Sequence, residues 1–477
     1  MLFERIEDKG LAQYSYIVGC EGSGEVAVVD PRRDVDVYLD FISARRFRIT
    51  HVLETHIHAD FASGALELAT RTGAQLSLSA FDTNETYQVR FQHVALRDRE
   101  TIALGHVRLQ ALHTPGHTPE HMSYLVFDGR RSLEYPMVLL SGDFLFVGSI
   151  GRPDLLGKGQ TDTLARRLYD SVRRVLAPLP DGLEIAPGHG AGSMCGAGMS
   201  SRPTSTLGFE RMANPYLRTG LSENEFVRMV LERVPPLPDY YLRMKALNAR
   251  GPRLLDGLPG LKAVPVEQFR RAIAAAPDGP VVIDLRDQVS FGSAHIPGAF
   301  GIGAGSNVST WASWVVPYER PLWLVASRVE DIEPAVRSLV RVGLDDVQGY
   351  LDGGMDAWIA AGGEQTHTPQ LAPEQLAARL GETGLHVLDV RSDEEWGEGY
   401  IEGAQHVAAG ELAARLRELP DAGTLVVVCG TGYRSTVAAS VLERAGRTGV
   451  INLTGGMAAW HAAGLPVVID TPSKLTV

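Results

Sequence analysis

The second half of this 477-residue chain contains an internal repeat, which limits the possible folds more than any other feature. Residues 281–299, VVIDLRDQVSFGSAHIPGA, align with residues 386–404, HVLDVRSDEEWGEGYIEGA, at an offset of 105. Residues 351–362, LDGGMDAWIAAG, align with residues 453–464, LTGGMAAWHAAG, at an offset of 102. Each copy therefore has about 100 residues, which suits a compact α/β domain and is too long for a solenoid unit.

The first half alternates β-rich and helical segments and does not repeat itself. The segment RITHVLETH (48–56) predicts a strand that runs directly into a cluster of histidines. The proline-rich stretch 234–255 is interpreted as the connector that leaves this region. A chain of this length is too long for one hydrophobic core. We therefore predict three domains, over residues 1–255, 256–365 and 372–470.

Composition excludes several classes of function. The net charge of -12 argues against a nucleic-acid partner, because binding to phosphate backbones depends on clustered lysine and arginine. No apolar run of about 18 residues predicts a membrane span, and the charged start MLFERIEDKG does not resemble a secretory signal. The three cysteines are odd in number and widely spaced, so we expect a reducing cytoplasmic location rather than a disulfide framework.

Metal-binding residue types follow the predicted strands of the first half. The segment ETHIHADFASG (54–64) places two histidines and an aspartate at alternate positions, and glycine- or proline-containing loops carry further candidates. The complete set is His56, His58, Asp60, His117, Asp143 and His189. Imidazole and carboxylate groups at this density predict a metal site.

This order of residues resembles the metallo-β-lactamase fold, an αββα sandwich whose usual HxHxDH motif commonly holds two metal ions. The sequence departs from that motif at Phe61, where the dinuclear hydrolases have a histidine. A phenyl ring cannot donate to a metal, so one ion is expected. Two histidines and one carboxylate form the facial triad of non-haem Fe(II) oxygenases, and His56, His117 and Asp143 would fill those roles. His58, Asp60 and His189 would then lie close by or in an outer shell, and zinc could substitute for iron.

The segment SGDFLFVGSIGRPDLLG (141–157) resembles the persulfide dioxygenase branch of the same superfamily, in which a GRxD segment follows the metal-bound aspartate. Arg152 and Asp154 occupy those positions, either as a pair that braces the loop or, for Arg152, as a substrate contact. Cys195 follows His189 by six residues and is either a thiol near the metal pocket or an inert loop cysteine.

The second copy of the repeat carries a possible sulfur-transfer site. In VVVCGTGYRSTVAAS (426–440) a predicted strand leads to Cys429, a glycine-containing loop and a helix. Backbone N–H groups of such a loop stabilise a thiolate, and Arg434 adds a positive charge for an anion such as sulfite. Both copies resemble rhodanese domains in their DLR and DVR, HIPGA and YIEGA, and GGMxAW motifs. In the first copy, Ser327 replaces the cysteine and Ile332 replaces the arginine, so this copy is expected to be inactive.

The complete combination resembles the fusion of a persulfide dioxygenase with tandem rhodanese domains. The resemblance implies oxidation of glutathione or coenzyme A persulfide by O2 to sulfite and thiol, with rhodanese transfer of sulfur giving thiosulfate in sulfide detoxification. It also implies a homo-oligomer. Two alternatives remain open: a thioester hydrolase of the glyoxalase II type, and a non-oxidative sulfur carrier whose metal domain only binds ligand.

Overall fold

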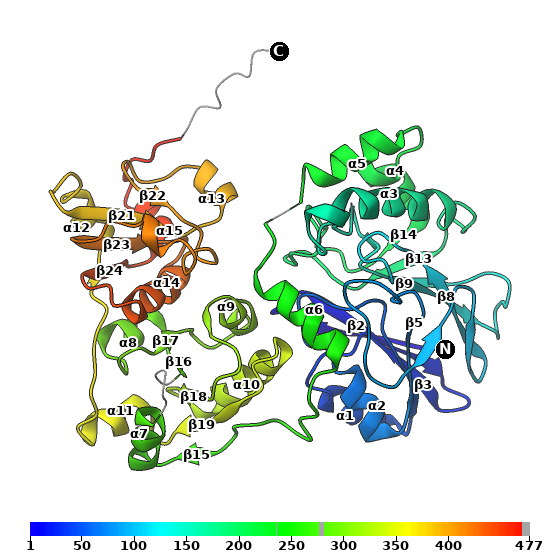
Figure 1. Cartoon of the computed structure of the whole chain (residues 1–477), viewed down its shortest axis with the longest axis horizontal. Helices are drawn as coiled ribbons and strands as arrows, with labels where there is room; N and C mark the ends of the chain where they lie inside the picture. Colours follow the sequence, from blue (N-terminus) through cyan, green and yellow to red (C-terminus); the bar gives the residue numbers. More distant parts are fainter. Residues whose placement is uncertain (235, 276–280, 470–477) are drawn as a thin grey trace. The chain divides into compact units, whose positions relative to one another are not determined.

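The computed structural model describes residues 1–234, 236–275 and 281–469. The chain forms two compact units (Figure 1): residues 1–257 with the short segment 340–343, and residues 258–339 with the chain from 344 onward. Both units mix helices with sheets, so the predicted α/β multidomain class is confirmed. None of the helices in the described part of the chain is long and apolar enough to cross a membrane.

The first unit is a sandwich of two six-stranded sheets. The first sheet has the order β1-β2-β3-β4-β5-β6. Its strands are β1 (Leu2–Asp8), β2 (Gln13–Cys20), β3 (Glu25–Val29), β4 (Arg48–Leu53), β5 (Gln75–Ser79) and β6 (Val94–Leu96). The second sheet has the order β14-β13-β10-β9-β8-β7. Its strands are β7 (Thr101–Leu104), β8 (Val107–His113), β9 (Met122–Asp128), β10 (Val138–Gly142), β13 (Glu184–Pro187) and β14 (Ser205–Thr206).

Helices cover the outer face of each sheet, which gives the predicted αββα arrangement (Figure 1). The helices α1 (Asp36–Arg45) and α2 (Ala65–Thr72) pack against the first sheet. The helices α3 (Lys158–Arg174) and α5 (Glu223–Leu231) pack against the second sheet, close to α4 (Leu207–Ala213).

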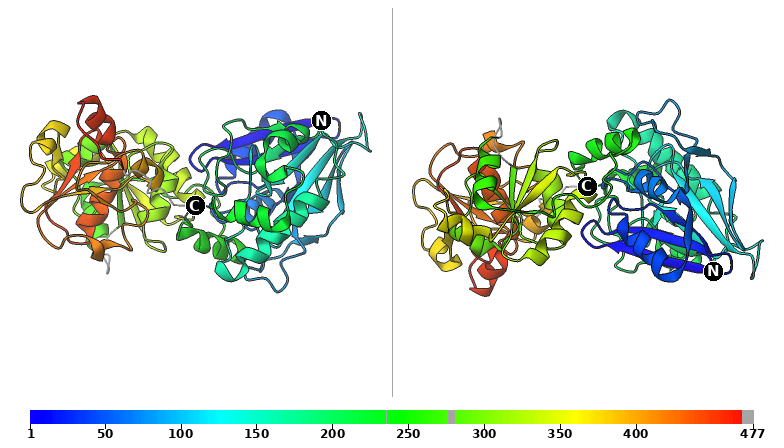
Figure 2. Two further views of the ribbon diagram at one scale, coloured as in Figure 1. Left: turned by 90° about the horizontal axis from the view of Figure 1, so that it is seen from above. Right: turned by 90° about the horizontal axis from the view of Figure 1, so that it is seen from below.

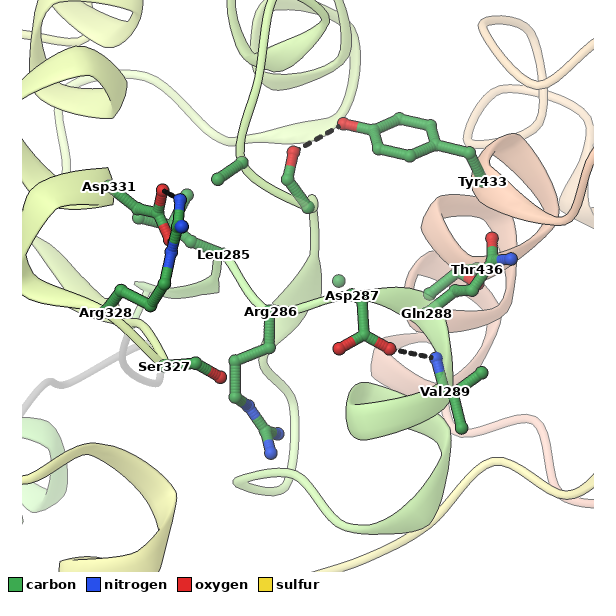
Figure 3. Close-up of a pocket in the computed structure, with 13 residues that line it drawn as sticks. Leu285, Arg286, Asp287, Gln288, Val289, Ser327, Arg328, Asp331, Tyr433 and Thr436 are labelled. Carbon is green, nitrogen blue, oxygen red and sulfur yellow. Dashed lines mark hydrogen bonds and ion pairs between the residues drawn. The ribbon is translucent and has the colours of Figure 1, made fainter.

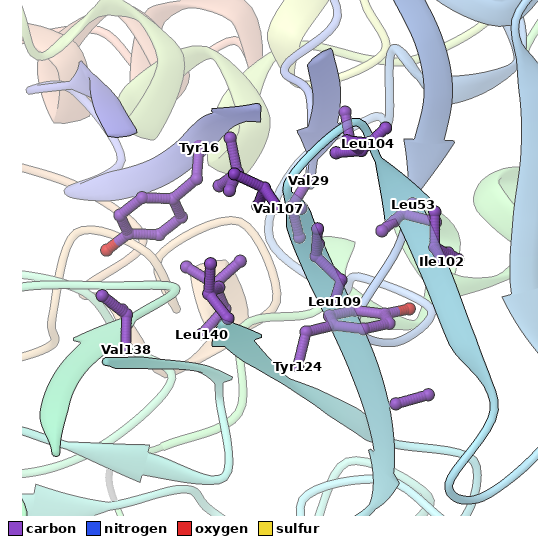
Figure 4. Packing of buried hydrophobic residues seen from close by; sticks show 14 of the residues in the cluster. Tyr16, Val29, Leu53, Ile102, Leu104, Val107, Leu109, Tyr124, Val138 and Leu140 are labelled. Atoms are coloured by element: carbon purple, nitrogen blue, oxygen red, sulfur yellow. The ribbon is translucent and has the colours of Figure 1, made fainter. Parts of the chain in front are cut away.

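Successive side chains of a strand point to opposite faces of the sheet, which explains how both faces of the sheets are buried. In β2, Tyr16 and Val18 point between the sheets, whereas Ile17 points to the helical layer. Figure 4 shows the central layer, in which Tyr16 and Leu53 from the first sheet face residues of the second, such as Leu140. Burial on both faces explains why these strands are continuously apolar.

One predicted strand is shorter than expected. We expected 48–56 to be extended as far as His56, but β4 ends at Leu53. The backbone N–H of Thr55 donates to Asp30 Oδ1 at 2.6 Å instead of to a neighbouring strand. The carboxylate of Asp30 therefore ends the backbone pairing of β4, and the following residues form a loop.

The second unit contains two five-stranded parallel sheets of identical strand order, one from each copy of the repeat. The first sheet has the order β15-β19-β18-β16-β17, and the second has β20-β24-β23-β21-β22. The strands are β15 (Ala263–Val264), β16 (Val281–Asp284), β17 (Phe300–Gly301), β18 (Leu322–Val325), β19 (Val347–Leu351), β20 (Gln370–Leu371), β21 (Leu385–Asp389), β22 (Gln405–His406), β23 (Thr424–Val428) and β24 (Val450–Leu453). The repeated sequence thus gives a repeated topology.

Helices flank the sheets of the second unit (Figure 2). They are α7 (Val266–Ala274), α8 (Gln288–Ser293), α9 (Val308–Val315), α10 (Ile332–Arg341), α11 (Gly354–Ala360), α12 (Pro373–Ala377), α13 (Asp393–Gly397), α14 (Tyr433–Arg444) and α15 (Gly456–Ala462). The tryptophans of the two GGMxAW motifs, Trp358 and Trp460, are both buried. Each indole N–H donates to a carbonyl oxygen six residues later, at 2.8 and 2.9 Å. The tryptophan of the motif therefore holds the segment that follows it in the same way in both copies.

Candidate functional site

Three predicted metal ligands from different strand ends converge in the first unit. His56 lies in the loop after β4, His117 in the loop after β8, and Asp143 directly after β10. One ligand atom from each lies within 4.8 Å of the other two. Asp143 Oδ2 is 3.8 Å from His56 Nε2 and 3.5 Å from His117 Nε2. These separations suit atoms that bind one shared ion.

The donor atoms themselves fit a metal ion. His56 Nε2, His117 Nε2 and Asp143 Oδ2 are buried and have no hydrogen-bond partner among the described residues. Orphaned buried polar atoms are costly, and a cation at their meeting point would satisfy all three. Burial, reinforced by neighbouring imidazoles, holds the pKa of His56 and of His117 well below the usual histidine range. Neutral imidazole is the form that binds metals. Together with the fold, this donor set implies a metal ion.

The second nitrogen of each histidine is held by the protein. Thr55 Oγ1 lies 2.8 Å from His56 Nδ1 and donates to Asp30 Oδ2, also at 2.8 Å. His117 Nδ1 lies 2.9 Å from the carbonyl oxygen of Arg152. Such contacts fix the ring orientation and direct the Nε2 atoms to the site.

A further histidine, which the sequence analysis did not single out, orients Asp143. His121 Nε2 accepts the backbone N–H of Asp143 at 3.0 Å. The preceding residue, Gly142, has φ +51°, and a Cβ there would lie 2.6 Å from His121 Nε2. A larger residue is therefore excluded where the strand turns the aspartate inward.

His58 is close to the three-residue cluster but turns away from it. Its Nε2 lies 2.7 Å from Glu54 Oε2 and 3.2 Å from Asp30 Oδ1. Burial alone lowers the pKa of His58, but these two carboxylates outweigh it and raise the pKa well above the usual range. Its ring packs on buried Phe61, with centroids 4.3 Å apart.

Asp60, His189 and Cys195 form a second group of possible ligands, whose donor atoms also lie within 4.8 Å of one another. His189 Nδ1 lies 2.7 Å from Asp143 Oδ1, and its Nε2 lies 2.8 Å from Asp60 Oδ2. The two carboxylates outweigh burial and raise the pKa of His189 to about 10. Cys195 is buried, and burial raises the pKa of its thiol well above the usual value. The structure thus places Cys195 beside the predicted metal region as a thiol rather than a thiolate.

Arg152 braces the loops behind the site. Its Nε and Nη2 donate to Asp154 at 2.7 and 2.8 Å, and its Nη1 donates to the Met194 carbonyl at 2.9 Å. Its own backbone carbonyl faces His117. Of the two sequence interpretations, these contacts favour the bracing pair.

The stretch 234–255, interpreted from sequence as a connector, contributes a wall of the metal site. It contains α6 (Tyr240–Arg250), and three side chains on one face of this helix reach the metal region. Asn248 Nδ2 donates to the carbonyls of His58 and Phe61 at 2.9 and 2.8 Å, and its Oδ1 accepts the N–H of Ser63 at 2.9 Å. Buried Lys245 donates to the carbonyl of Ile57 at 2.8 Å.

Tyr241 completes this face of α6, with its hydroxyl 3.8 Å from Cys195 Sγ. Glu120 also holds this loop, because its carboxylate accepts the N–H of Ile57 at 3.0 Å. No motif in the sequence pointed to these residues. Only the i, i+4, i+7 spacing of the α6 side chains carried a signal, and such spacing does not name a partner.

In the second unit, Cys429 follows β23 and is completely buried. The N–H of Gly432 donates to its sulfur at 3.1 Å, and Ser435 Oγ lies 3.4 Å away, where α14 begins. The expected loop between strand and helix is present. Arg434 is also at this loop, but its guanidinium is paired with the carboxylate of Glu395.

The first copy keeps a cavity at the position that corresponds to the cysteine loop. Its volume is about 520 Å³, and Ser327, Arg286 and Tyr433 are among its lining residues (Figure 3). Tyr433 of the second copy donates to the carbonyl of Gly303 in the first copy at 3.0 Å. Gln288 Nε2 of the first copy donates to the carbonyl of Thr431 at 3.4 Å. The first copy thus contacts the loop that carries Cys429.

Comparisons with known proteins agree with this architecture. Residues 8–189 match the metallo-beta-lactamase superfamily, and residues 372–463 match the rhodanese-like domain. The predicted resemblance to these two families is therefore confirmed.

Individual relatives support the first match. A probable metallo-hydrolase from Burkholderia pseudomallei is 30% identical over 53% of this chain and 94% of its own length. A hydroxyacylglutathione hydrolase from Anaeromyxobacter dehalogenans is 32% identical over 46% of this chain and 86% of its own length. The crystal structure of a metallo-beta-lactamase from Staphylococcus aureus is 34% identical, with a TM-score of 0.65, and the match covers 73% of this chain and 98% of that one.

Proposed function

The chain belongs to the metallo-beta-lactamase superfamily, and from this premise and its rhodanese-like domain we propose that it oxidises low-molecular-weight persulfides at one iron ion and transfers sulfur through Cys429. The observation that carries the proposal is the buried cluster of two imidazoles and one carboxylate with unpaired donor atoms. This donor set is the facial triad of non-haem Fe(II) oxygenases.

His56, His117 and Asp143 would hold the iron, which would supply electron transfer between the persulfide and O2. One persulfide, one O2 and one water give one thiol and one sulfite with two protons. The surrounding protein holds the ligands in place: Thr55 orients His56, His121 orients Asp143, and α6 holds the loop backbone. Such pre-organisation avoids rearrangement during the reaction.

Two features support a single metal ion. Phe61 occupies the place of a ligand in the dinuclear motif and is buried against His58. His189 directs both ring nitrogens to carboxylates, one to Asp143 and one to Asp60. A histidine engaged in this way bridges the two acids without a second cation.

Sulfur transfer would use Cys429. Its thiolate takes the outer sulfur of a persulfide and releases the thiol. Sulfite then attacks that sulfur, so the S–S bond at Cys429 breaks, the S–S bond of thiosulfate forms, and the electron pair remains on the Cys429 sulfur. The N–H of Gly432 stabilises this sulfur in its anionic state. All three cysteines are unpaired, which fits the reducing cytoplasm that we propose as the location.

A thioester hydrolase is the second candidate. The donor atoms of Asp60, His189 and Cys195 lie close enough to bind another ion, and one relative is a hydroxyacylglutathione hydrolase. Two metal ions with an activated hydroxide would then perform hydrolysis. Metal analysis of the purified protein together with an oxygen electrode separates the two functions.

We expect one iron per chain and O2 uptake that depends on glutathione persulfide or coenzyme A persulfide. Two zinc ions, hydrolysis of S-lactoylglutathione and no O2 uptake would refute the proposal. The variants Cys429→Ser and His117→Ala test the division of labour. Cys429→Ser should keep O2 uptake and lose thiosulfate formation, whereas His117→Ala should lose O2 uptake but still form thiosulfate when sulfite is added. A wild-type protein without O2 uptake, whose sulfur chemistry is completely lost in Cys429→Ser, would favour the non-oxidative sulfur carrier.

A further inference from the structure

An ion pair lies beside the residue that follows Cys429. Arg434 Nη1 and Nη2 each contact one carboxylate oxygen of Glu395, both at 2.5 Å. A Cβ added to Gly430 would lie 3.1 Å from Arg434 Nη2 and 3.5 Å from Glu395 Oε1. Gly430 therefore provides the space that the pair occupies next to the cysteine loop.

Glu395 is fixed in this position by its own helix. It is the third residue of α13, and its Oε2 accepts the backbone N–H and the hydroxyl of Ser392, both at 3.1 Å. This capping box joins the carboxylate to the start of the helix. The hydrogen bonds from Arg434 lower the pKa of Glu395 to about 2, although burial opposes them, so the side chain is ionised at neutral pH.

This contact changes the role that the sequence suggests for Arg434. Arginine binds oxyanions through a fork of two parallel N–H groups. Here the fork made by the two terminal nitrogens is occupied by the Glu395 carboxylate. An oxygen of sulfite or thiosulfate must displace Glu395 before it can use that fork.

We propose that Glu395 is an internal competitor for Arg434 and sets how tightly the Cys429 loop binds oxyanions. The proposal rests on the proposed sulfur transfer at Cys429. Glu395 acts through Arg434 and is a positioning residue: it exchanges no proton and forms no bond to sulfur. When sulfite binds, its oxygens replace the Glu395 carboxylate as the partner of Arg434. When thiosulfate leaves, the ion pair between Glu395 and Arg434 forms again. Weak binding of oxyanions favours release of product and keeps inorganic sulfate and phosphate out of the loop.

The test is Glu395→Gln in the full-length protein. Glutamine keeps the size of the side chain and its capping hydrogen bonds but removes the charge. A hydrogen bond between charged groups shifts an equilibrium by about tenfold or more. We therefore expect KM for sulfite and the inhibition constant for sulfate to fall roughly tenfold, while kcat stays the same or decreases and O2 uptake is unchanged.

Two further variants make the test specific. Glu395→Asp keeps a carboxylate and should restore part of the wild-type KM. Glu394→Gln, an exposed position on the same helix, is the matched control and should behave as wild type. Unchanged KM and inhibition constant in Glu395→Gln would overturn the proposal.

Binding of radiolabelled sulfate gives a readout that does not need turnover. If wild type and Glu395→Gln bind sulfate equally, Glu395 is not a competitor. If Glu395→Gln binds more tightly but neither protein forms thiosulfate, the inference about Glu395 stands and the proposed sulfur transfer fails.

Discussion

Replacement of Asn248 by alanine tests whether α6 is part of the metal centre. Asn248 makes three buried hydrogen bonds to the backbone of the loop that carries His56. The hydrogen bonds of its side chain go to backbone atoms and not to the donor atoms of the predicted metal ligands. An effect on metal binding would therefore have to pass through the position of the loop.

The structure gives the expected magnitude. Asn248→Ala leaves the carbonyls of His58 and Phe61 and the N–H of Ser63 without these partners in a buried region. Each lost partner costs about 1–3 kcal/mol, and water that enters the space recovers part of it. We expect a loss of about 3–6 kcal/mol in local stability and, as for other residues that orient ligands, a fall in metal affinity of about 10–100-fold.

Two measurements check this expectation. Amide hydrogen exchange of residues 56–63 reports the local stability of the loop, and competition with a chelator of known affinity reports iron binding. Asn224→Ala, at an exposed asparagine on α5, is the control. If Asn248→Ala retains iron as tightly as wild type while exchange in the loop accelerates, α6 stabilises the fold but does not position the metal site.

Three other perturbations have defined outcomes. Thr55→Val removes the hydroxyl beside His56 Nδ1, so iron affinity should fall about 10–100-fold in the chelator assay, with Thr50→Val as the control. Arg152→Lys loses the two-pronged contact with Asp154 and should lower the free energy of unfolding in urea by about 1–3 kcal/mol; an unchanged midpoint would show that this pair does not brace the loop. The folded-state pKa of Glu395 is about 2, below its ordinary value of 4.5, so its contribution to stability is complete above about pH 4.5 and is lost as the pH falls towards 2. The free energy of unfolding of Glu395→Gln should lack this part of the pH dependence. Identical pH profiles of stability for the wild type and the variant would contradict this expectation.

Much of the candidate site could be predicted from the sequence, because the strands are short and glycine- or proline-containing loops mark where they end. Each predicted ligand lies in a loop just after a β-strand, so the chain pattern indicated which residues could converge. The resemblance then separated His56, His117 and Asp143 from the other candidates, and the structure brings these three together. It also places His58 beside them but directs its ring to Glu54 and Asp30.

The stretch 234–255 does more than lead out of the first unit, and its composition could not show this for a physical reason. Composition and proline content describe local backbone preferences, whereas the role of Asn248 depends on carbonyl groups almost 190 residues earlier. The same holds for Glu395, which lies 39 residues before its partner Arg434. No periodicity in the chain links such pairs.

The repeat, the alternation of strands and helices and the types of residue at the two sites could be read from the sequence alone, because periodicity, loop glycines and motifs are properties of the chain itself. The layered architecture was expected from the resemblance to the metallo-β-lactamase fold. The fold was needed to show which donor atoms share one space, which way His58 turns and whether Arg434 stands alone or paired. Those outcomes depend on burial and on contacts between distant segments, and in a buried site the nearest charged or hydrogen-bonding neighbour determines what each side chain can do.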